Sequence, residues 1–455
     1  MSPEINPTIF REYDIRGLAD QDLTDQAVES VAKAYGTLMK REGRKTVSLG
    51  YDMRLSSTRI QKAFQRGLLS TGLDVIDIGM VATPMLYFSI AYWKLDGGVM
   101  ITGSHNPSEY NGLKPCRGTG SVYGKEIQKI REMALTGDFE KGQGTVRTRD
   151  IAEDYRNYLK QQFKFTRKMK VVVDSGNGMG GLLSPQMFRE LGCEVIELFS
   201  KPDGNFPNHH PDPTQTKNLV HLIQKVKETK ADIGIAFDGD GDRVGVVDEK
   251  GEIVWGDKLL ILYSRAILKK QPGATFIADV KCSKTLYDDI KKHGGNGVMS
   301  KTGHAIIKSQ IKELNAALAG ELSGHMFFND RYFGFDDALY AACRVLEILD
   351  QAGTQKFSEL LSDVPVMYST PEIHADTTDT KKFQIVEKAK TFFKASYEVV
   401  DIDGVRVTFP DGWGLVRASN TQPVLVMRFE ASTPARLQEI QNLVESKVTE
   451  LIQSA

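Results

Sequence analysis

The sequence predicts an α/β protein in which three domains of related mixed α/β topology are followed by a smaller α+β domain. The chain has 455 residues, and at about 150 residues per domain this length allows several domains with cores of their own. Short β-branched strand patterns alternate with amphipathic helix patterns, which is typical of α/β layers. This alternation repeats three times before the pattern changes. We place the four domains at residues 1–149, 150–252, 253–366 and 367–455.

Each of the three copies is expected to contain short strands, a helix after the first strand, and a polar loop with glycines at its end. The strands are expected at 46–51, 73–80 and 97–102, at 170–174, 193–199 and 232–237, and at 275–280, 297–300 and 316–319. The helices are expected at 56–71, 184–191 and 283–293. Ligands of open α/β sheets bind in crevices where strands end. We therefore expect the three terminal loops to converge on one site.

The last part of the chain has a different pattern. The polar stretch 374–380 is predicted to be a linker between domains. Residues 399–402 and 405–409 predict a β-hairpin, because both flanks alternate and the Asp-Gly pair between them suits a turn with positive φ. A closing helix is expected after Thr433, which is its N-cap and precedes a proline. One face of that helix is apolar and consists of Leu437, Ile440, Val444, Val448 and Leu451.

The composition excludes several classes of partner. Lys and Arg number 58 against 59 Asp and Glu, so the net charge of −1 gives no basic surface for nucleic acid or anionic membranes. No stretch approaches the roughly 18 apolar residues of a membrane span, and residues 1–17 lack the apolar segment of a secretory signal. The 4 cysteines are scattered without a CxxC pair, which argues against a disulfide framework and a zinc site. We expect a cytoplasmic protein that binds neither nucleic acid nor membranes.

Asp238, Asp240 and Asp242 alternate with glycines, so the backbone can curl and direct three carboxylates to one centre. Oxygen ligands in this number suit Mg²⁺ or Ca²⁺, and clustered carboxylates repel one another unless a cation relieves them. The spacing also matches part of an EF-hand. The sixth position of that loop needs glycine, however, and here it is Arg243, while the flanks have strand patterns rather than helix patterns. The sequence therefore predicts a divalent-metal loop of another kind.

Three further loops carry polar groups that suit a phosphorylated sugar. Ser104 follows a glycine but lacks the G-x-S-x-G pattern of a nucleophile elbow, and a serine beside a metal loop indicates phosphoryl transfer. The loop 320–325 combines a carboxylate, a hydroxyl and an imidazole, which suit sugar hydroxyls. The segment 417–421 supplies a guanidinium, two hydroxyls and an amide, which suit a phosphate dianion. Taken alone, each of these loops also suits an ordinary structural turn.

Taken in order, eight motifs closely resemble those of the α-D-phosphohexomutase superfamily, and they span nearly the whole chain. The motifs are YDIRG from Tyr13, TGSHNP from Thr102, NGLK from Asn111, DGDGDR from Asp238, DVKCS from Asp279, KTGH from Lys301, GELSGH from Gly320 and RASNT from Arg417. Within the superfamily the sequence is most similar to the bacterial phosphomannomutase/phosphoglucomutase enzymes. The resemblance implies four domains around a central cleft, and a Mg²⁺-dependent conversion between the 1-phosphates and 6-phosphates of mannose and glucose. It also implies an active-site phosphoserine and a hexose 1,6-bisphosphate, such as glucose 1,6-bisphosphate, as intermediate and activator.

The resemblance further assigns roles to individual residues. Ser104 is expected to be the phosphoserine, and its phosphate is expected to contact Mg²⁺ together with Asp238, Asp240 and Asp242. Lys114 is the first candidate for acid/base catalysis. The other groups expected beside the reacting atoms are Arg16, His105, Arg243, His304 and His325. The groups expected to bind the substrate hexose phosphate are Tyr13, Lys281, Glu321, Ser323, Arg417, Ser419, Asn420 and Thr421.

Alternative functions use the same parts. A Mg²⁺-dependent phosphatase would pass the phosphoryl group from Ser104 to water, because that outcome depends on how fully the site closes. A non-catalytic sensor would only bind sugar phosphates, and a phosphoglucosamine or phospho-N-acetylglucosamine mutase would need room for a larger group near C2. The proton acceptor stays open among Lys114, His304 and His325. We expect a monomer, because each domain contributes one loop to a single cleft.

Overall fold

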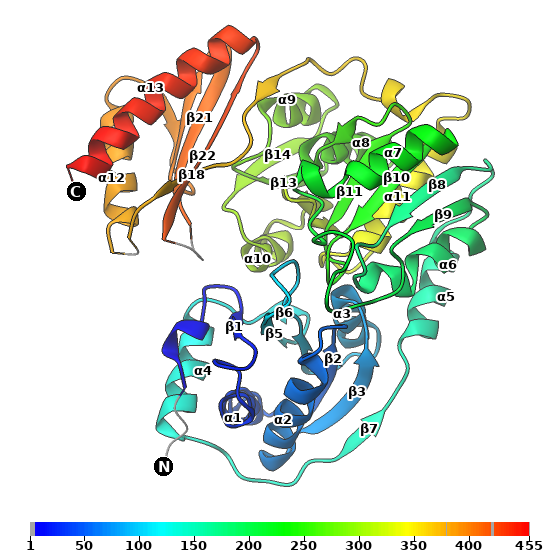
Figure 1. Ribbon diagram of the computed structural model, residues 1–455, viewed down its shortest axis with the longest axis vertical. Coiled ribbons are helices and arrows are strands. Elements are labelled where there is room, and N and C mark those ends of the chain that lie inside the picture. The colour runs from blue at the N-terminus through cyan, green and yellow to red at the C-terminus, as the bar shows by residue number, and fades with distance from the viewer. Residues whose placement is uncertain (1–4, 379, 420–422, 455) are drawn as a thin grey trace.

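The computed structural model describes residues 5–378, 380–419 and 423–454 (Figure 1). Four β-sheets follow one another along the chain, with helices packed on them. In Figure 1 the N-terminal part, in blue and cyan, lies below the green and yellow parts, and the orange and red C-terminal part lies at the upper left. Among the helices of the described ranges, none combines the length and the apolar character that a membrane crossing requires.

The first sheet has seven strands in the order β1-β5-β4-β2-β3-β7, with β6 paired to β5. Its strands are β1 (Ile15–Leu18), β2 (Thr46–Tyr51), β3 (Asp74–Met80), β4 (Gly97–Ile101), β5 (Tyr110–Arg117), β6 (Gly120–Ser121) and β7 (Val146–Thr148). Its helices are the short 3-10 helix η1 (Pro7–Ile9), α1 (Asp25–Arg41), α2 (Ser57–Ser70), α3 (Thr83–Tyr92) and α4 (Lys125–Thr136). Strand β4 is buried along its whole length, as expected of a central parallel strand with both faces covered.

The second and third sheets contain five and four strands, in the orders β12-β11-β10-β8-β9 and β14-β13-β15-β16. The second part comprises α5 (Ala152–Gln162), β8 (Lys170–Asp174), η2 (Met179–Leu182), α6 (Ser184–Glu190), β9 (Glu194–Leu198), η3 (Thr216–Asn218), α7 (Val220–Thr229), β10 (Ile233–Phe237), β11 (Val244–Asp248) and β12 (Ile253–Val254). The third comprises α8 (Gly256–Leu268), β13 (Thr275–Asp279), α9 (Lys284–Lys292), β14 (Asn296–Ser300), α10 (His304–Leu314), β15 (Leu318–Gly320), β16 (Met326–Phe328), α11 (Ala338–Gln351) and η4 (Phe357–Glu359).

These three sheets share one topology. In each, three parallel strands lie in the spatial order third, first, second, and an antiparallel fourth strand pairs with the third: β5-β4-β2-β3, β11-β10-β8-β9 and β16-β15-β13-β14. The loop between the third and fourth strands carries Ser104 in the first sheet and residues 238–243 and 321–325 in the next two. The predicted relatedness of the three copies is confirmed, and it explains why their polar loops occupy equivalent sheet ends.

The C-terminal sheet is antiparallel, with the order β17-β22-β21-β20-β19 and β18 paired to β22. Its elements are β17 (Tyr368–Ser369), β18 (Ile373–Asp376), α12 (Lys382–Lys394), β19 (Glu398–Val400), β20 (Val405–Phe409), β21 (Gly412–Ala418), β22 (Val424–Ala431) and α13 (Pro434–Gln453). The Thr433 side chain accepts a hydrogen bond from the Arg436 amide, which confirms the predicted N-cap of α13. Buried residues Ile440, Val444 and Val448 confirm the apolar face of this helix.

Two predictions about this last part need correction. The proposed linker 374–380 is wrong in its first half, because β18 pairs with β22 over those residues. Ile373 and Ala375 pack against the core of this sheet while the intervening side chains are exposed, so the segment has the period of two of an edge strand. The predicted hairpin is confirmed, but its first strand ends at Val400 and its turn is longer than two residues.

The first three sheets share a continuous apolar core, whereas the C-terminal sheet has a core of its own. Phe88 of α3 packs edge-on against Tyr155 of α5, with ring centroids 5.2 Å apart. Tyr340 of α11 packs against Phe163, just after α5, at 5.3 Å. These contacts join helices from three parts of the chain. They therefore help to fix the positions of the three site loops relative to one another. The domain limits given above stay a prediction.

Candidate active site

Ser104 lies in a tight loop after β4 and is held in a left-handed conformation, with φ of 49°. The serine is buried, and its amide donates to Thr102 Oγ1 at 2.8 Å. Its Oγ is 3.0 Å from His105 Nδ1 and 3.2 Å from Asp238 Oδ2. A non-glycine residue with positive φ is strained, and this conformation persists only where the surrounding structure enforces it. Such strain is common at functional sites.

The loop after β10 wraps around the carboxylate of Asp238. Asp238 Oδ1 accepts hydrogen bonds from the amides of Gly241, Asp242 and Arg243, at 3.0, 3.0 and 3.1 Å. This arrangement uses one carboxylate oxygen to fix the loop and leaves the other directed at Ser104. Of the two glycines predicted to let the backbone curl, Gly241 has a positive φ of 77°.

Asp238, Asp240 and Asp242 bring one oxygen each within 4.8 Å of one another, and all three side chains are buried. Within the described ranges, Asp240 Oδ1 has no hydrogen-bond partner. Lys114, which projects from β5, donates to Asp240 Oδ2 and to Asp242 Oδ2, at 2.7 Å each. Three converging hard oxygens with an unused buried lone pair fit a divalent cation such as Mg²⁺.

The charges in this cluster perturb one another. Burial, together with the Asp242 and Asp240 charges, raises the pKa of Asp238 well above its usual range. Burial acts in the same direction on Asp242, but Lys114 and His325 hold the pKa of that carboxyl well below its usual range. Mutual repulsion thus opposes a charge on all three carboxylates at once, and a bound cation would relieve it.

Positive groups surround Ser104 on the other side. Arg16 of β1 donates to Asn106 Oδ1 at 3.1 Å and pairs with Asp14, so it lies beside the serine loop. Burial, with the charges of Arg243 and Arg16, lowers the pKa of His105 well below its usual range. A neutral imidazole next to the hydroxyl and two guanidinium groups in its vicinity suit the negative charge of a phosphoryl group.

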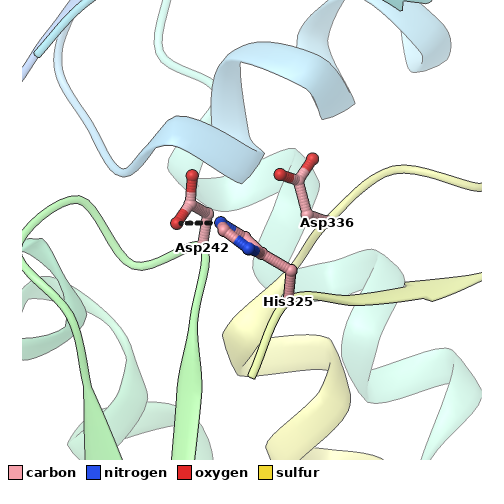
Figure 2. Close-up of side chains that lie close together, drawn as sticks. All are labelled: Asp242, His325 and Asp336. Carbon is pink, nitrogen blue, oxygen red and sulfur yellow. Dashed lines mark ion pairs between the residues drawn. The ribbon is translucent and has the colours of Figure 1, made fainter. Parts of the chain in front are cut away.

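His325 connects the DGDGDR loop with the loop after β15. Its Nε2 is 3.2 Å from Asp242 Oδ1 and its Nδ1 is 2.8 Å from Glu321 Oε2, as Figure 2 shows for the Asp242 pair. Burial lowers the pKa of His325, but these carboxylates outweigh it and raise the pKa to about 9. Glu321 also accepts from the amide of Gly303 at 2.6 Å, and the hydroxyl of Ser323 is 3.1 Å from His325 Nδ1.

A second set of three metal-type ligands, Asp242, His325 and Asp336, also converges within 4.8 Å (Figure 2). Lys308 lies 3.0 Å from Asp336 Oδ1, so an ammonium group already balances that carboxylate. Lys114 balances two carboxylates of the DGDGDR loop in the same way. That loop, however, offers three carboxylates and no imidazole, and such a set of oxygen ligands suits Mg²⁺ better.

A short segment between β14 and α10 joins the remaining predicted residues. Tyr13 donates to the carbonyl of Thr302 at 3.1 Å, and the amide of Thr302 donates to Asp403 Oδ2 at 3.1 Å. The same Asp403 oxygen accepts from Arg417 Nε at 2.9 Å. His304, the first residue of α10, stacks on His325 with centroids 6.0 Å apart. Arg417 of the C-terminal sheet is thus tied to the loops of the other sheets.

The structure brings most of the predicted site residues into one network, with clear exceptions. Lys281 bonds Glu372 at 2.7 Å, and Arg428 donates to the Lys281 carbonyl, so this lysine lies where the C-terminal sheet meets the loop after β13. Ser419 is buried at the end of β21. Asn420 and Thr421, predicted to bind phosphate, lie outside the described residues.

Arg54, which the sequence motifs did not indicate as a site residue, organises the serine loop. Its buried guanidinium donates to four carbonyls: those of Pro107 and Tyr110 from Nη1, at 2.6 and 2.9 Å, and those of Ser104 and Asn106 from Nη2, at 2.9 and 2.5 Å. These bonds fix the loop on which Ser104 has its strained conformation. Arg54 follows the end of β2, a central parallel strand. Because ligands of such sheets bind where strands end, this position indicated a residue near the site.

Asp52 supports the same loop. It accepts from the amide of Gly103 at 3.2 Å and lies 3.4 Å from Arg54 Nε. A β-carbon at Gly103 would stand 2.5 Å from the Arg54 guanidinium, so the glycine allows the arginine its close approach. Thr83 was missed as well: its hydroxyl donates to Asp240 Oδ2 at 2.5 Å and fixes α3 to the DGDGDR loop.

Four family models match consecutive parts of the chain. They describe phosphoglucomutase/phosphomannomutase α/β/α domains I, II and III, over residues 7–141, 153–251 and 255–368, and the C-terminal domain, over 372–447.

Similar proteins extend over the same length. A phosphomannomutase/phosphoglucomutase of Pseudomonas syringae is 46% identical over 449 residues, which cover 98% of this chain and 96% of the relative. A phosphoglucomutase of Neisseria meningitidis is 45% identical and covers 95% of each chain. The crystal structure of a phosphoglucomutase/phosphomannomutase family protein from Burkholderia thailandensis superimposes with a TM-score of 0.93 at 42% identity and covers 98% of each chain.

Proposed function

The chain belongs to the phosphoglucomutase/phosphomannomutase family, and on that premise we propose that it interconverts the 1-phosphates and 6-phosphates of mannose and glucose through a phosphoserine at Ser104. The observation that carries the proposal is the 3.2 Å contact between Ser104 Oγ and Asp238 Oδ2, beside two further carboxylates and Lys114. The names of the Pseudomonas and Neisseria relatives support both the reaction and the two sugars.

In the first half-reaction, the bond between phosphorus and Ser104 Oγ breaks as a bond forms to the free hydroxyl oxygen of a hexose 1-phosphate. The hydroxyl proton passes to a base, Ser104 Oγ regains a proton, and the product is a hexose 1,6-bisphosphate. The bisphosphate then turns around and returns its other phosphate to Ser104. When bound by Asp238, Asp240 and Asp242, Mg²⁺ neutralises charge on the transferring group.

Positioned side chains supply the rest of the proposed chemistry. Arg16 and Arg243 provide charge around Ser104 for the phosphoryl oxygens. Lys114 bonds two of the three aspartates, so its ammonium group is directed at the same centre. The base among Lys114, His304 and His325 stays open, and all three lie within this network.

One phosphate must be anchored while the other reacts. Arg417 is held through Nε by Asp403, and the two terminal nitrogens of a guanidinium suit a phosphate. Glu321 and Ser323 supply a carboxylate and a hydroxyl for the sugar hydroxyls between the two phosphates. Mannose and glucose differ only at C2. Hydrogen bonds to the neighbouring hydroxyls would leave the C2 hydroxyl without a contact, so both sugars could bind. We expect Glu321→Ala to lose catalytic efficiency with both sugars. Unchanged efficiency would refute the proposal that Glu321 binds the sugar hydroxyls.

The test is ³¹P NMR of the purified protein with Mg²⁺, mannose 1-phosphate and a trace of glucose 1,6-bisphosphate. The spectrum resolves the 1-phosphate, the 6-phosphate, the bisphosphate and inorganic phosphate. We expect conversion to the 6-phosphate without release of inorganic phosphate, and the same with glucose 1-phosphate. Accumulation of inorganic phosphate would instead indicate a phosphatase. Ser104→Ala is the matched control, since it removes the acceptor atom and little else.

We also propose that the protein acts as a monomer in the cytoplasm. Each of the first three sheets contributes one loop to the candidate site and Arg417 comes from the fourth, which supports a site built within one chain. Light scattering coupled to gel filtration tests the monomer, and twice the mass of one chain would contradict it.

A further inference from the structure

A buried charged group made of His304, Lys308 and Asp336 lies next to the candidate active site. His304 and Lys308 are four residues apart in α10, so their side chains lie on the same face of the helix. Asp336 is fully buried just before α11, and its Oδ1 is 3.0 Å from Lys308 Nζ. Lys308 also lies over the ring of Tyr87, 4.0 Å from its centroid. Lys308 therefore has one fixed position, and it occupies one oxygen of Asp336.

The other oxygen of Asp336 faces His304. Asp336 Oδ2 is 3.7 Å from His304 Nδ1, and both atoms are buried without a hydrogen-bond partner among the residues that the structure describes. A hydrogen bond between nitrogen and oxygen is about 2.7–3.2 Å long, and unpaired buried polar atoms are costly. Catalytic hydrogen bonds are often long before substrate binds and shorten in the complex. The two atoms are therefore poised to pair with each other.

The carboxylate restricts which nitrogen of His304 carries the proton. Burial, together with the charges of Lys308 and Lys114, lowers the pKa of His304 well below its usual range, so the ring is neutral and has one donor and one acceptor nitrogen. With a lone pair on Nδ1, the ring would repel Asp336 Oδ2. With a proton on Nδ1, it donates to that oxygen, and Nε2 on the far edge of the ring becomes the acceptor.

We propose that Asp336 is a positioning residue for His304: it accepts the Nδ1 proton and so presents Nε2 as a hydrogen-bond acceptor to a hydroxyl of the sugar phosphate. The role of His304 toward the sugar rests on the function proposed above, whereas its pairing with Asp336 does not. Lys308 fixes the orientation of the Asp336 carboxylate, because it binds the oxygen that does not face the imidazole.

The effect of Asp336→Asn on the tautomer of His304 can be predicted, because Lys308 can only donate hydrogen bonds. The amide oxygen of the asparagine must therefore face Lys308, and the amide nitrogen must face His304. A donor at that position favours a lone pair on Nδ1 and a proton on Nε2. The substitution should thus reverse the tautomer of His304 without changing the size of the side chain.

The first readout is the ¹⁵N spectrum of protein labelled at histidine, which distinguishes protonated from unprotonated ring nitrogens and needs no catalytic activity. His304→Asn assigns the signal by its loss. We expect a protonated Nδ1 in the wild type and a protonated Nε2 in Asp336→Asn, in a protein whose other histidine signals remain. The same tautomer in both proteins would overturn the proposal.

The second readout is a double-mutant cycle on mutase turnover. We expect Asp336→Asn to lower kcat about 10- to 100-fold, as loss of such an orienting partner typically does, with KM changed less than threefold. In the His304→Asn background the same substitution should change kcat less than about twofold. An equal loss in both backgrounds would show that Asp336 acts through the fold and not through His304.

Asp337→Asn is the matched control. Asp337 is also buried, but it accepts hydrogen bonds from Tyr155 and Tyr332 and caps α11. We expect its kcat to stay within twofold of the wild type and its His304 tautomer to stay unchanged. A wild type that lacks turnover while its spectrum shows a protonated Nδ1 would refute the proposed function and leave the pairing supported.

Discussion

Replacing Arg54 by lysine should loosen the loop that carries Ser104. The guanidinium reaches four carbonyls from two nitrogens and has no exposed side-chain surface. A lysine ammonium is a single point with three donors, and it can satisfy about two of these carbonyls. Two lost hydrogen bonds to a charged group, at about 1.5–3 kcal/mol each, predict a destabilisation of about 3–6 kcal/mol.

The assay is thermal unfolding followed by circular dichroism, together with steady-state kinetics. For a unit of 150–250 residues, about 1 kcal/mol corresponds to roughly 2–4 °C, so we expect the first transition of Arg54→Lys to fall by about 6 °C or more. Below that transition the variant should also have a lower kcat, because the loop that positions Ser104 is loosened.

Arg66→Lys is the matched control for Arg54→Lys. Arg66 lies in α2 and makes surface ion pairs with Asp25 and Glu29. Exposed pairs contribute roughly 0–1 kcal/mol, so the transition should move by no more than a few degrees. If Arg54→Lys unfolds at the temperature of Arg66→Lys and turns over like the wild type, the four carbonyl bonds do not support the serine loop.

Three further outcomes are expected. Lys114→Met should lower kcat by about 10² to 10⁴ with KM nearly unchanged, since positioned proton transfer and charge are lost, and turnover near that of the wild type would remove Lys114 from this role. Asp240→Asn should weaken Mg²⁺ binding in calorimetry at least tenfold, and an unchanged affinity would exclude Asp240 as a ligand. Burial raises the pKa of Asp337 to about 6 from 3.8, so the folded state binds this proton more tightly than the unfolded state. Its contribution to the free energy of unfolding is therefore full below pH 4 and falls by about 3 kcal/mol as pH rises to 6. The unfolding temperature of Asp337→Asn relative to the wild type should rise over that interval, and a constant difference would contradict the reasoning.

The elements of this fold could be predicted because their signals are local. Each predicted strand and helix of the three copies occurs within two residues of its expected position, since strand composition and helix periodicity do not depend on distant contacts. The linker at 374–380 was wrong because a short edge strand with exposed polar residues resembles a loop. Only its pairing with β22 reveals it, and that partner lies some fifty residues further along the chain.

The candidate site was predictable in part for the same reason. Ser104 and the three aspartates lie in compact motifs, and the structure brings them into contact. Arg54 carries no motif, because its task is to bind backbone carbonyls, which every residue has. In the sequence, Asp403 indicates only a turn, as part of an Asp-Gly pair. Its contact with Thr302 depends on how the C-terminal sheet packs against the loop before α10.

The two residues Thr302 and Gly303 contact side chains from three separate parts of the chain, namely Tyr13, Glu321 and Asp403. A β-carbon at Gly303 would stand 2.6 Å from the Tyr13 ring, and the glycine has φ of 138°, so no other residue is accommodated there without displacement. In a library of random substitutions, this position should therefore tolerate fewer replacements than its neighbours. Variants that displace the loop at Glu321 should regain lost stability through second changes near Tyr13 or Asp403, far away in the sequence.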